Sequence, residues 1–416
     1  MKKLDIKEIT LSNGLKVITL EDHFIPIVSY FTLYKVGSRN EIPGITGISH
    51  LFEHMMFKGS KKFNNVSFDK ILEPMGGYSN AYTSRDMTVY YENFPPDALK
   101  LVVELDSDRM SNLNLEIEEL DSEREVVKEE RRYRTDNSII GKMDEVLYSS
   151  AYSAHSYRNP IVGWMPDLDN ISLERCREYL STYYNPVNSR IVVVGDFITD
   201  ELVSMIEENY GNIQVNPGRE NLMTQEPGQS GEKRIECPKA AQIYSIMAGY
   251  HVPEVKSGDT FALEVLQTIL TDGEGSHLQR ELIYKQQKAV AVYSDFTWRI
   301  DPSLFVFYIQ MKPGVTGLEG ENAVYNEIDK IKEGGISDSD IIKAKNKLES
   351  SFWDTVKTAT GLAEKIGVCE LLFDDYTFIY NVLDEFNKIQ KEDIIAVVDK
   401  YFKKSNRTVV TLIPQS

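Results

Sequence analysis

The sequence predicts an α+β protein built from two similar halves. Strand and helix patterns alternate irregularly along the 416 residues, a helix–strand pattern recurs at the end of the chain, and a polar stretch rich in proline and glycine separates its two copies. Irregular alternation favours mixed layers over a doubly wound parallel sheet. The length is ample for two domains that each bury their own core.

The first elements are predicted to be strands. Residues 9–11 and 15–20 read as the two strands of a hairpin, and the Asn13-Gly14 pair between them is the strongest short turn signal. Another strand is expected over residues 28–36.

Two helices carry the residues of greatest chemical interest. The first is expected from about Gly47 to Phe57, because Gly59 stands where the end of a helix favours a left-handed residue. The second, from Glu116 to Arg134, is strongly helical and acidic.

An internal repeat organises the chain. An amphipathic helix over 171–184 precedes a buried-type strand over 188–194, and the same order recurs over 389–402 and 405–410. The helices align without a gap at a shift of 389 − 171 = 218 residues. We therefore predict domains at residues 1–212 and 233–416, joined by a polar linker over 213–232.

Composition excludes some partners. The net charge is 46 − 64 = −18, which would repel a phosphate backbone, so no nucleic-acid partner is expected. No apolar run approaches the length of a membrane span, so no membrane partner is expected either. The three cysteines (Cys176, Cys237 and Cys369) are far apart and odd in number, and the N-terminus is charged; both favour a reducing, cytoplasmic location.

The strongest chemical signal is the pattern HxxEH in the first helix. At about 100° per residue, His54 lies about 40° from His50 around the helix and Glu53 about 60° to the other side, so all three share one face. Two imidazoles one turn apart can bind one zinc ion, an arrangement typical of inverzincins. The alternative is two core histidines and a solvated glutamate, but buried unpaired polar groups on so apolar a helix are costly.

A zinc site requires a third protein ligand, which the residues alone do not decide. The other four histidines are isolated: His23, His155, His251 and His277. Several acids of the helix over 116–134 could serve, and Glu123 and Glu130 lie seven apart on one face. A solvated charged surface is the competing interpretation of that helix.

The chain resembles the M16 metallopeptidases, the group of pitrilysin, insulin-degrading enzyme and the mitochondrial processing peptidase, and most of all their short bacterial members. The resemblance is dense in the first half and weaker but continuous in the second. Its matching stretches are Asn13–Val17, Val36–Glu41, Gly47–Gly59, Gly76–Thr83 and Glu123–Glu130.

The resemblance implies a metal site and a mechanism. It assigns the third zinc ligand to Glu130, an orienting carboxylate beside a ligating histidine to Glu123, and the general base to Glu53. Glu53 would take the proton of the attacking water and return it to the leaving amine. The second half has no histidine in the corresponding helix, so one Zn²⁺ per chain is expected.

The resemblance also implies a fold and a substrate. The expected fold is two halves of LuxS/processing-peptidase type facing each other as a clamshell around a peptide substrate. The strand at Asn80, Ala81, Tyr82 and Thr83 would bind substrate backbone as an added strand, with an ordinary sheet edge as the alternative.

The second half departs from the family at one point. Many members have an arginine and a tyrosine after a glycine-rich loop, but Ile283 stands in the arginine's place and Tyr293 only near the tyrosine's. Arg280 or Tyr284 is a possible substitute. Alternatively the chain is the zinc-bearing subunit of a pair, so we expect a homodimer or a heterodimer with a related subunit. The functions to be distinguished are an endopeptidase, a zinc-binding but inactive subunit, and an interaction protein without metal.

Overall fold

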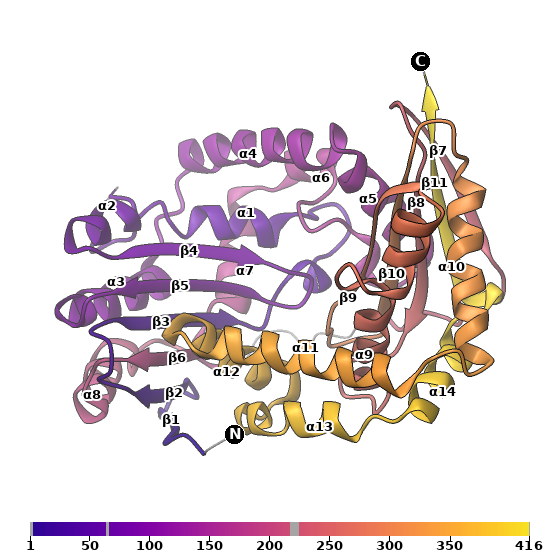
Figure 1. The fold of residues 1–416 in the computed structure, drawn as a ribbon. Coiled ribbons are helices and arrows are strands. Elements are labelled where there is room, and N and C mark those ends of the chain that lie inside the picture. The colour runs from indigo at the N-terminus through magenta and orange to yellow at the C-terminus, as the bar shows by residue number, and fades with distance from the viewer. Residues whose placement is uncertain (1–2, 64–65, 217–223, 416) are drawn as a thin grey trace. The chain divides into compact units, whose positions relative to one another are not determined.

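The computed structural model describes residues 3–63, 66–216 and 224–415. Their contacts divide them into two units. Unit 1 takes in the described residues of 1–134, 159–223 and 354–380, and unit 2 those of 135–158, 224–353 and 381–416. Each unit is one β-sheet covered by helices (Figure 1).

The sheet of unit 1 has six strands in the order β1-β2-β6-β3-β5-β4. The β2–β6 pair is parallel and the other pairs are antiparallel. The strands are β1 (Lys7–Thr10), β2 (Lys16–Glu21), β3 (Val28–Tyr34), β4 (Tyr78–Thr83), β5 (Thr88–Phe94) and β6 (Ser189–Gly195). The helices are α1 (Ile48–Met55), α2 (Phe68–Leu72), α3 (Leu99–Asn112), α4 (Ile117–Arg131), α6 (Met165–Asn170), α7 (Leu173–Tyr183), α8 (Thr199–Tyr210) and α12 (Ala359–Phe373).

The sheet of unit 2 has five strands in the order β7-β11-β8-β10-β9. The strands are β7 (Lys233–Ala240), β8 (Ser245–Val252), β9 (Ala289–Phe296), β10 (Ser303–Met311) and β11 (Arg407–Gln415). The helices are α5 (Ile139–Ala151), α9 (Thr260–Thr271), α10 (Gly317–Lys332), α11 (Asp338–Val356, whose last residues belong to unit 1), α13 (Val382–Lys388) and α14 (Lys391–Tyr401).

The two sheets share one topology. The order β2-β6-β3-β5-β4 corresponds to β7-β11-β8-β10-β9, and in both the first pair is parallel and the later pairs antiparallel. The repeat predicted from the sequence belongs to this correspondence. Helix α7 is followed by β6 in the first unit, and α14 is followed by β11 in the second. The α+β class with two similar halves is confirmed, and the enclosure of a substrate between the halves stays a prediction.

Each half of the sequence gives one helix to the other unit. In unit 1, α12 covers the sheet face opposite to α1 and α3, where Gly367 lies so close to β3 that an added Cβ would meet the Leu33 side chain at 2.6 Å. Glu370 of α12 is buried and pairs with Lys16 (2.7 Å) and Arg190 (3.2 Å). In unit 2, α5 packs on β8 and β11. The two units therefore differ from the predicted continuous domains over residues 1–212 and 233–416. Each of these two helices packs on the sheet formed mainly by the other half of the sequence.

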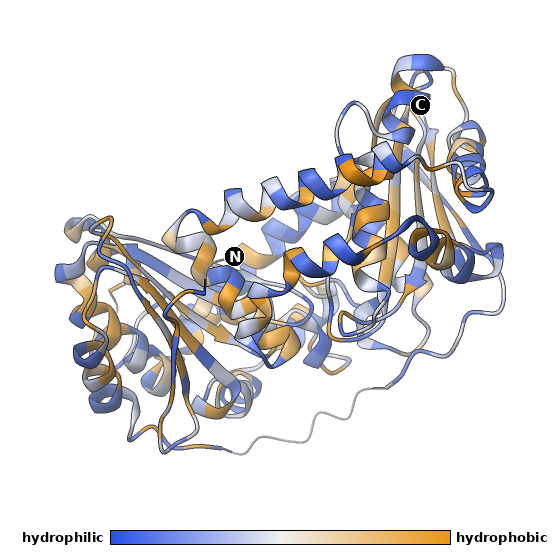
Figure 2. Ribbon diagram, turned by 60° about the horizontal axis from the view of Figure 1, so that its bottom comes forward, coloured by the Kyte–Doolittle hydropathy of each residue, from blue (hydrophilic) through white to orange (hydrophobic). Residues whose placement is uncertain are grey.

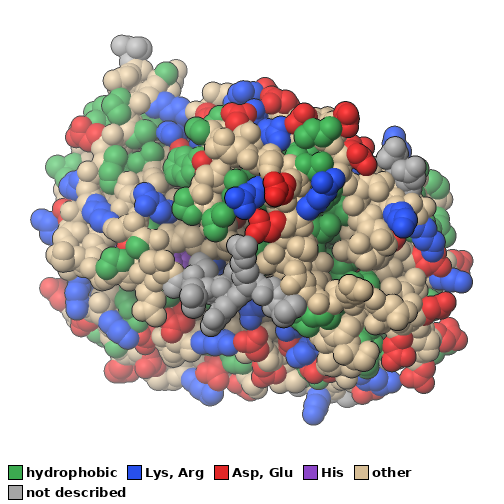
Figure 3. All heavy atoms as spheres, turned by 180° about the vertical axis from the view of Figure 1, so that it is seen from behind, with side chains coloured by type: hydrophobic (Ala, Val, Ile, Leu, Met, Phe, Trp, Pro, Cys, Tyr) green, Lys and Arg blue, Asp and Glu red, His purple; other side chains and the backbone are tan. Residues whose placement is uncertain are grey.

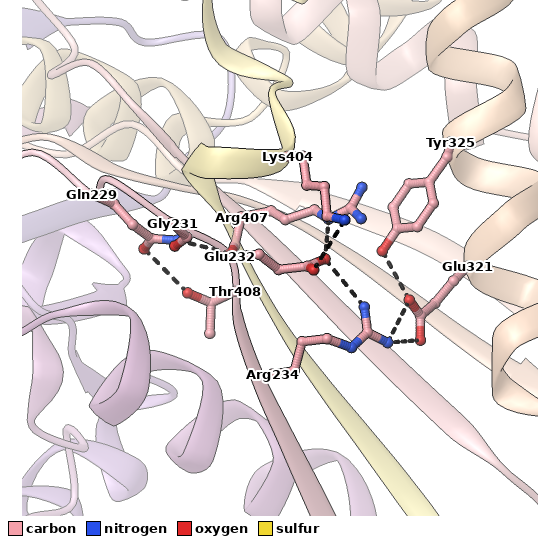
Figure 4. Close-up of polar contacts among 9 residues, drawn as sticks. All are labelled: Gln229, Gly231, Glu232, Arg234, Glu321, Tyr325, Lys404, Arg407 and Thr408. Carbon is pink, nitrogen blue, oxygen red and sulfur yellow. Dashed lines mark hydrogen bonds and ion pairs between the residues drawn. The ribbon is translucent and has the colours of Figure 1, made fainter.

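The predicted linker over 213–232 is partly tied to unit 2. Residues 217–223 lie outside the described residues. Glu232 pairs with Arg407 of β11 (2.6 Å) and Arg234 of β7 (3.1 Å), and Arg234 pairs with Glu321 of α10 (2.8 Å), which also accepts a hydrogen bond from Tyr325 (Figure 4). This network joins the end of the linker to two strands and a helix.

Local predictions were close to the observed elements. The hairpin is β1 and β2 with Thr10 opposite Lys16, and the strand over 28–36 is β3. The two helices are α1 and α4, but the turn after α4, Arg132–Asp136, widens into a π-helix.

Hydrophobic residues gather along the strands, and the outer sides of the helices carry hydrophilic residues (Figure 2). On the face drawn in Figure 3, lysine and arginine are interspersed with aspartate and glutamate. No helix among the described residues combines the length and the apolarity needed to cross a bilayer.

Candidate metal centre and active site

Helix α1 holds the HxxEH residues, and its start is fixed by a buried carboxylate. Gly47 precedes the helix with φ 88°, a conformation that favours glycine. Glu41 accepts hydrogen bonds from the backbone N–H groups of Gly47 and Ser49, both at 2.8 Å, which satisfies donors that the first turn leaves unpaired. One side of α1 packs into the core, and Figure 1 shows α1 beside β4 with α4 next to it.

Helix α4 brings Glu130 to the two histidines. The distance from Glu130 Oε2 is 3.4 Å to His54 Nε2 and 3.7 Å to His50 Nε2. The three ligand atoms lie within 4.8 Å of one another, the one such group of metal-binding side chains in the described part of the chain. His50 is buried, while His54 and Glu130 are partly buried.

The donor set fits zinc. Two ligands of a tetrahedral zinc ion at about 2.0–2.1 Å lie about 3.3 Å apart, close to the observed separations of Glu130 from both imidazoles. Two imidazoles and one carboxylate also leave a fourth position for water, as hydrolytic zinc sites require.

The two histidines differ in charge. Burial, helped by His54, lowers the pKa of His50 to about 4, so its imidazole is neutral at pH 7. Burial opposes protonation of His54 too, but hydrogen bonds with Glu123 and Glu130 outweigh it and raise the pKa to about 9. A cation that binds His54 therefore has to displace a proton.

Glu123 contacts the His54 ring at Nδ1, the ring nitrogen that does not face Glu130. Its Oε2 is 3.3 Å from His54 Nδ1, and its Oε1 forms an ion pair with Lys58, which follows His54 by four residues. The hydrogen bond from His54, more than the nearby Lys58, lowers the pKa of Glu123 against its burial. An ionised Glu123 would hold the His54 ring by Nδ1, leaving Nε2 facing Glu130.

Glu53 faces the sheet edge. Its Oε2 accepts a hydrogen bond of 2.6 Å from Thr83 Oγ1, at the end of β4. Burial raises the pKa of Glu53 against the hydrogen bond from Thr83, which favours its ionised form.

The four predicted substrate-binding residues lie on β4, one of the two edge strands of the sheet, and their side chains alternate between its faces. Ala81 packs against the core beside α1, and Thr83 reaches Glu53. Tyr82 points the other way and donates to Glu364 of α12 at 3.1 Å, while Asn80 is exposed.

The residues considered as replacements for the arginine–tyrosine pair all lie in unit 2. Arg280, Ile283 and Tyr284 share one turn of π-helix at Gln279–Lys285, where Arg280 is exposed and Tyr284 is 52% exposed. Tyr293 lies on β9, 39% exposed and 4.7 Å from the ring of Tyr308. That Arg280, Tyr284 or Tyr293 takes the place of the arginine–tyrosine pair stays a prediction.

Three contacts of the site were not predicted from the sequence: those of Lys58 with Glu123, of Glu41 with the start of α1, and of Thr83 with Glu53. Lys58 follows His54 by four residues, a spacing that places both on one side of a helical turn and could have indicated the contact with Glu123. Nothing in the sequence pairs Thr83 with Glu53, because the contact depends on how β4 packs against α1.

Comparisons with known proteins agree over both halves. The model described as Insulinase (Peptidase family M16) matches residues 16–164, and that described as Peptidase M16 inactive domain matches residues 170–348. The zinc protease PqqE of Helicobacter pylori is 32% identical over 419 residues, which cover 98% of this chain and 93% of that protein. The uncharacterized zinc protease YmxG of Bacillus subtilis is 24% identical, with 95% and 96% covered.

Solved structures give the same result. A protease from Helicobacter pylori superposes with a TM-score of 0.95 at 31% identity, over 99% of this chain and 100% of that one. A putative M16-like peptidase from Alicyclobacillus acidocaldarius shares the fold, with a TM-score of 0.85 at 18% identity over 100% and 99% of the two chains. From its sequence and its fold alike, this chain belongs to peptidase family M16.

Proposed function

We propose that the protein is a zinc-dependent endopeptidase that cleaves peptides or unfolded segments. The observation that carries the proposal is the convergence of His50, His54 and Glu130 within 4.8 Å, with Glu53 on the same helix as the two histidines. Family membership and the zinc proteases among the relatives support it. We expect one zinc ion per chain, because the described residues contain one such group.

His50, His54 and Glu130 would hold the metal, which when bound supplies a Lewis acid for the water and the scissile carbonyl. Glu53 accepts the proton of the attacking water and returns it to the leaving amine. Glu123 keeps His54 oriented by its Nδ1. The free edge of β4 binds the peptide backbone as an added strand, next to Glu53.

Replacing Glu53 by glutamine tests the enzyme assignment. The Glu53→Gln protein should bind as much zinc as the wild type, because no proposed ligand changes, but should lose hydrolysis in a peptide-library digest. The matched control is Glu129→Gln, an exposed residue of α4, which should leave both properties unchanged. Turnover by zinc-loaded Glu53→Gln at the wild-type rate would refute the role of Glu53.

A second candidate function follows from Ile283. An aliphatic side chain cannot donate to a developing oxyanion, and loss of such a donor typically raises a barrier by about 2.7–4 kcal/mol. On this alternative the chain binds zinc but cleaves peptides only with a related partner that supplies the donors. Cleavage by the pure protein at rates unchanged by a partner chain would exclude it; zinc binding without cleavage until a partner is added would establish it.

We also propose a cytoplasmic location. All three cysteines are free, as expected in a reducing compartment. One structure of similar fold, PqqL of Escherichia coli, is described as a periplasmic protease, so the location requires a direct test. Fractionation of cells that express the full-length protein should recover it with a cytoplasmic marker, and recovery with a periplasmic marker would contradict the proposal.

A further inference from the structure

The Thr83–Glu53 hydrogen bond links two parts of the site that the proposed function treats separately. Thr83 is the last residue of the substrate-binding strand β4, and Glu53 is the base on α1. Thr83 Oγ1 donates to Glu53 Oε2 at 2.6 Å. It is the one side-chain hydrogen bond that Glu53 makes among the described residues.

The position of Thr83 is fixed by its surroundings. Thr83 pairs with Thr88 at the end of the β4–β5 hairpin, and Ser84 closes the turn by accepting from the backbone N–H groups of Asp86 (3.2 Å) and Met87 (3.1 Å). The loop at Gly37 presses against this turn, because a Cβ there would meet the Ser84 carbonyl oxygen at 2.4 Å. A donor held this firmly can orient a neighbouring side chain.

The preceding residue of β4, Tyr82, is held on the other face of the sheet. Tyr82 donates to Glu364 of α12, so successive residues of the strand are anchored on opposite sides of the sheet. Thr83 is β-branched, which restricts the rotation that places its hydroxyl. Its bond uses Oε2 of Glu53 and leaves Oε1 as the second carboxylate oxygen.

We propose that Thr83 is a positioning residue for Glu53, so that the strand that receives the substrate also sets the orientation of the base. The threonine acts through Glu53 and does not itself touch the peptide. This inference rests on the proposed peptidase activity, and it gives the side chain of Thr83 a role separate from the backbone of β4.

The test compares Thr83→Val and Thr83→Ser. The valine has nearly the same shape without the hydroxyl, so kcat should fall about 10- to 100-fold, part of what a positioned base contributes, with KM within about twofold of the wild type. Thr83→Ser restores the donor and should bring kcat to within about threefold of the wild type. Zinc content should be the same in all three proteins.

The matched control is Thr88→Val. Thr88 lies directly opposite Thr83 in the hairpin, and its hydroxyl donates to the Val36 carbonyl oxygen (2.9 Å). This variant loses a hydrogen bond in the same place without touching Glu53, so kcat of the folded protein should not change. If Thr83→Val and Thr88→Val reduce kcat equally, or if Thr83→Ser is no better than Thr83→Val, the positioning role is refuted.

A binding measurement distinguishes positioning of Glu53 by Thr83 from direct contact of the Thr83 side chain with the substrate. Fluorescence anisotropy of a labelled peptide, one that the wild type cleaves, should give the same affinity for Glu53→Gln and for Glu53→Gln/Thr83→Val. Weaker binding by the double variant would mean that the Thr83 side chain contacts the substrate, and would overturn the inference. Failure of the proposed function is distinguishable, because the wild type would then cleave no peptide at all.

Discussion

Replacing Glu123 by glutamine tests how the metal site is oriented. Glu123 Oε2 lies 3.3 Å from His54 Nδ1, and Oε1 is paired with Lys58. Glutamine keeps an acceptor of the same size but loses the negative charge. His54 would then be held less firmly, and the Lys58 ammonium next to it would lose its counter-charge.

The expected effect is on zinc affinity. Removing a group that orients a ligating histidine typically weakens metal binding about 10- to 100-fold, which corresponds to about 1.4–2.8 kcal/mol. We expect the lower part of this range for Glu123→Gln, because the hydrogen bond can survive in neutral form. Glu130→Gln should weaken binding more, because a proposed ligand loses its charge.

Competition against a chromophoric zinc chelator at fixed pH and ionic strength measures this affinity. The matched control is Glu125→Gln on the same helix, an exposed residue that pairs with Lys128 (2.9 Å). Its Kd should stay within about twofold of the wild type. Equal dissociation constants for Glu123→Gln and Glu125→Gln would refute the orienting role.

Three further predictions concern stability. Arg109 is buried between Glu92 (2.9 Å) and Asp106, so Arg109→Met should lower the free energy of unfolding by about 3–5 kcal/mol in urea titrations; a loss below about 1 kcal/mol would contradict this. Gly367→Leu should lower it by about 1–3 kcal/mol, because the new side chain meets Leu33; an unchanged value would show that α12 can shift. Hydrogen bonds from Thr199 at the start of α8 lower the pKa of Glu21 to about 2. The ionised Glu21 side chain therefore stabilises the folded protein above pH 4.5, and this stabilisation is lost as the pH falls toward 2. The difference in Tm between the wild type and Glu21→Gln should therefore narrow below pH 4.5, and a constant difference would refute the assignment.

Local patterns were sufficient for the first hairpin and for the helix that holds the HxxEH residues. The Asn13-Gly14 turn predicts the first hairpin, and the spacing of His50, Glu53 and His54 predicts one helical face, because both depend on neighbours in sequence. Glu130 was different. Spacing left several acids of α4 equivalent, and the family resemblance selected the one that the structure brings to the histidines.

The exchange of α5 and α12 between the units could not be predicted from the sequence. An amphipathic helix shows that one side is buried but not which sheet buries it. Glu370 illustrates this. Its carboxylate is buried on α12 and forms ion pairs with Lys16 and Arg190, which are far away in sequence. The contact of Thr83 with Glu53 could not be predicted either, because it depends on how β4 packs against α1.

The most direct test of the metal centre is anomalous diffraction at the zinc absorption edge from crystals grown with zinc. We predict one peak per chain, bound by His50 Nε2, His54 Nε2 and a carboxylate oxygen of Glu130, with the fourth position open to water. A zinc ion held by a different set of residues, or no peak beside these three side chains, would contradict the account.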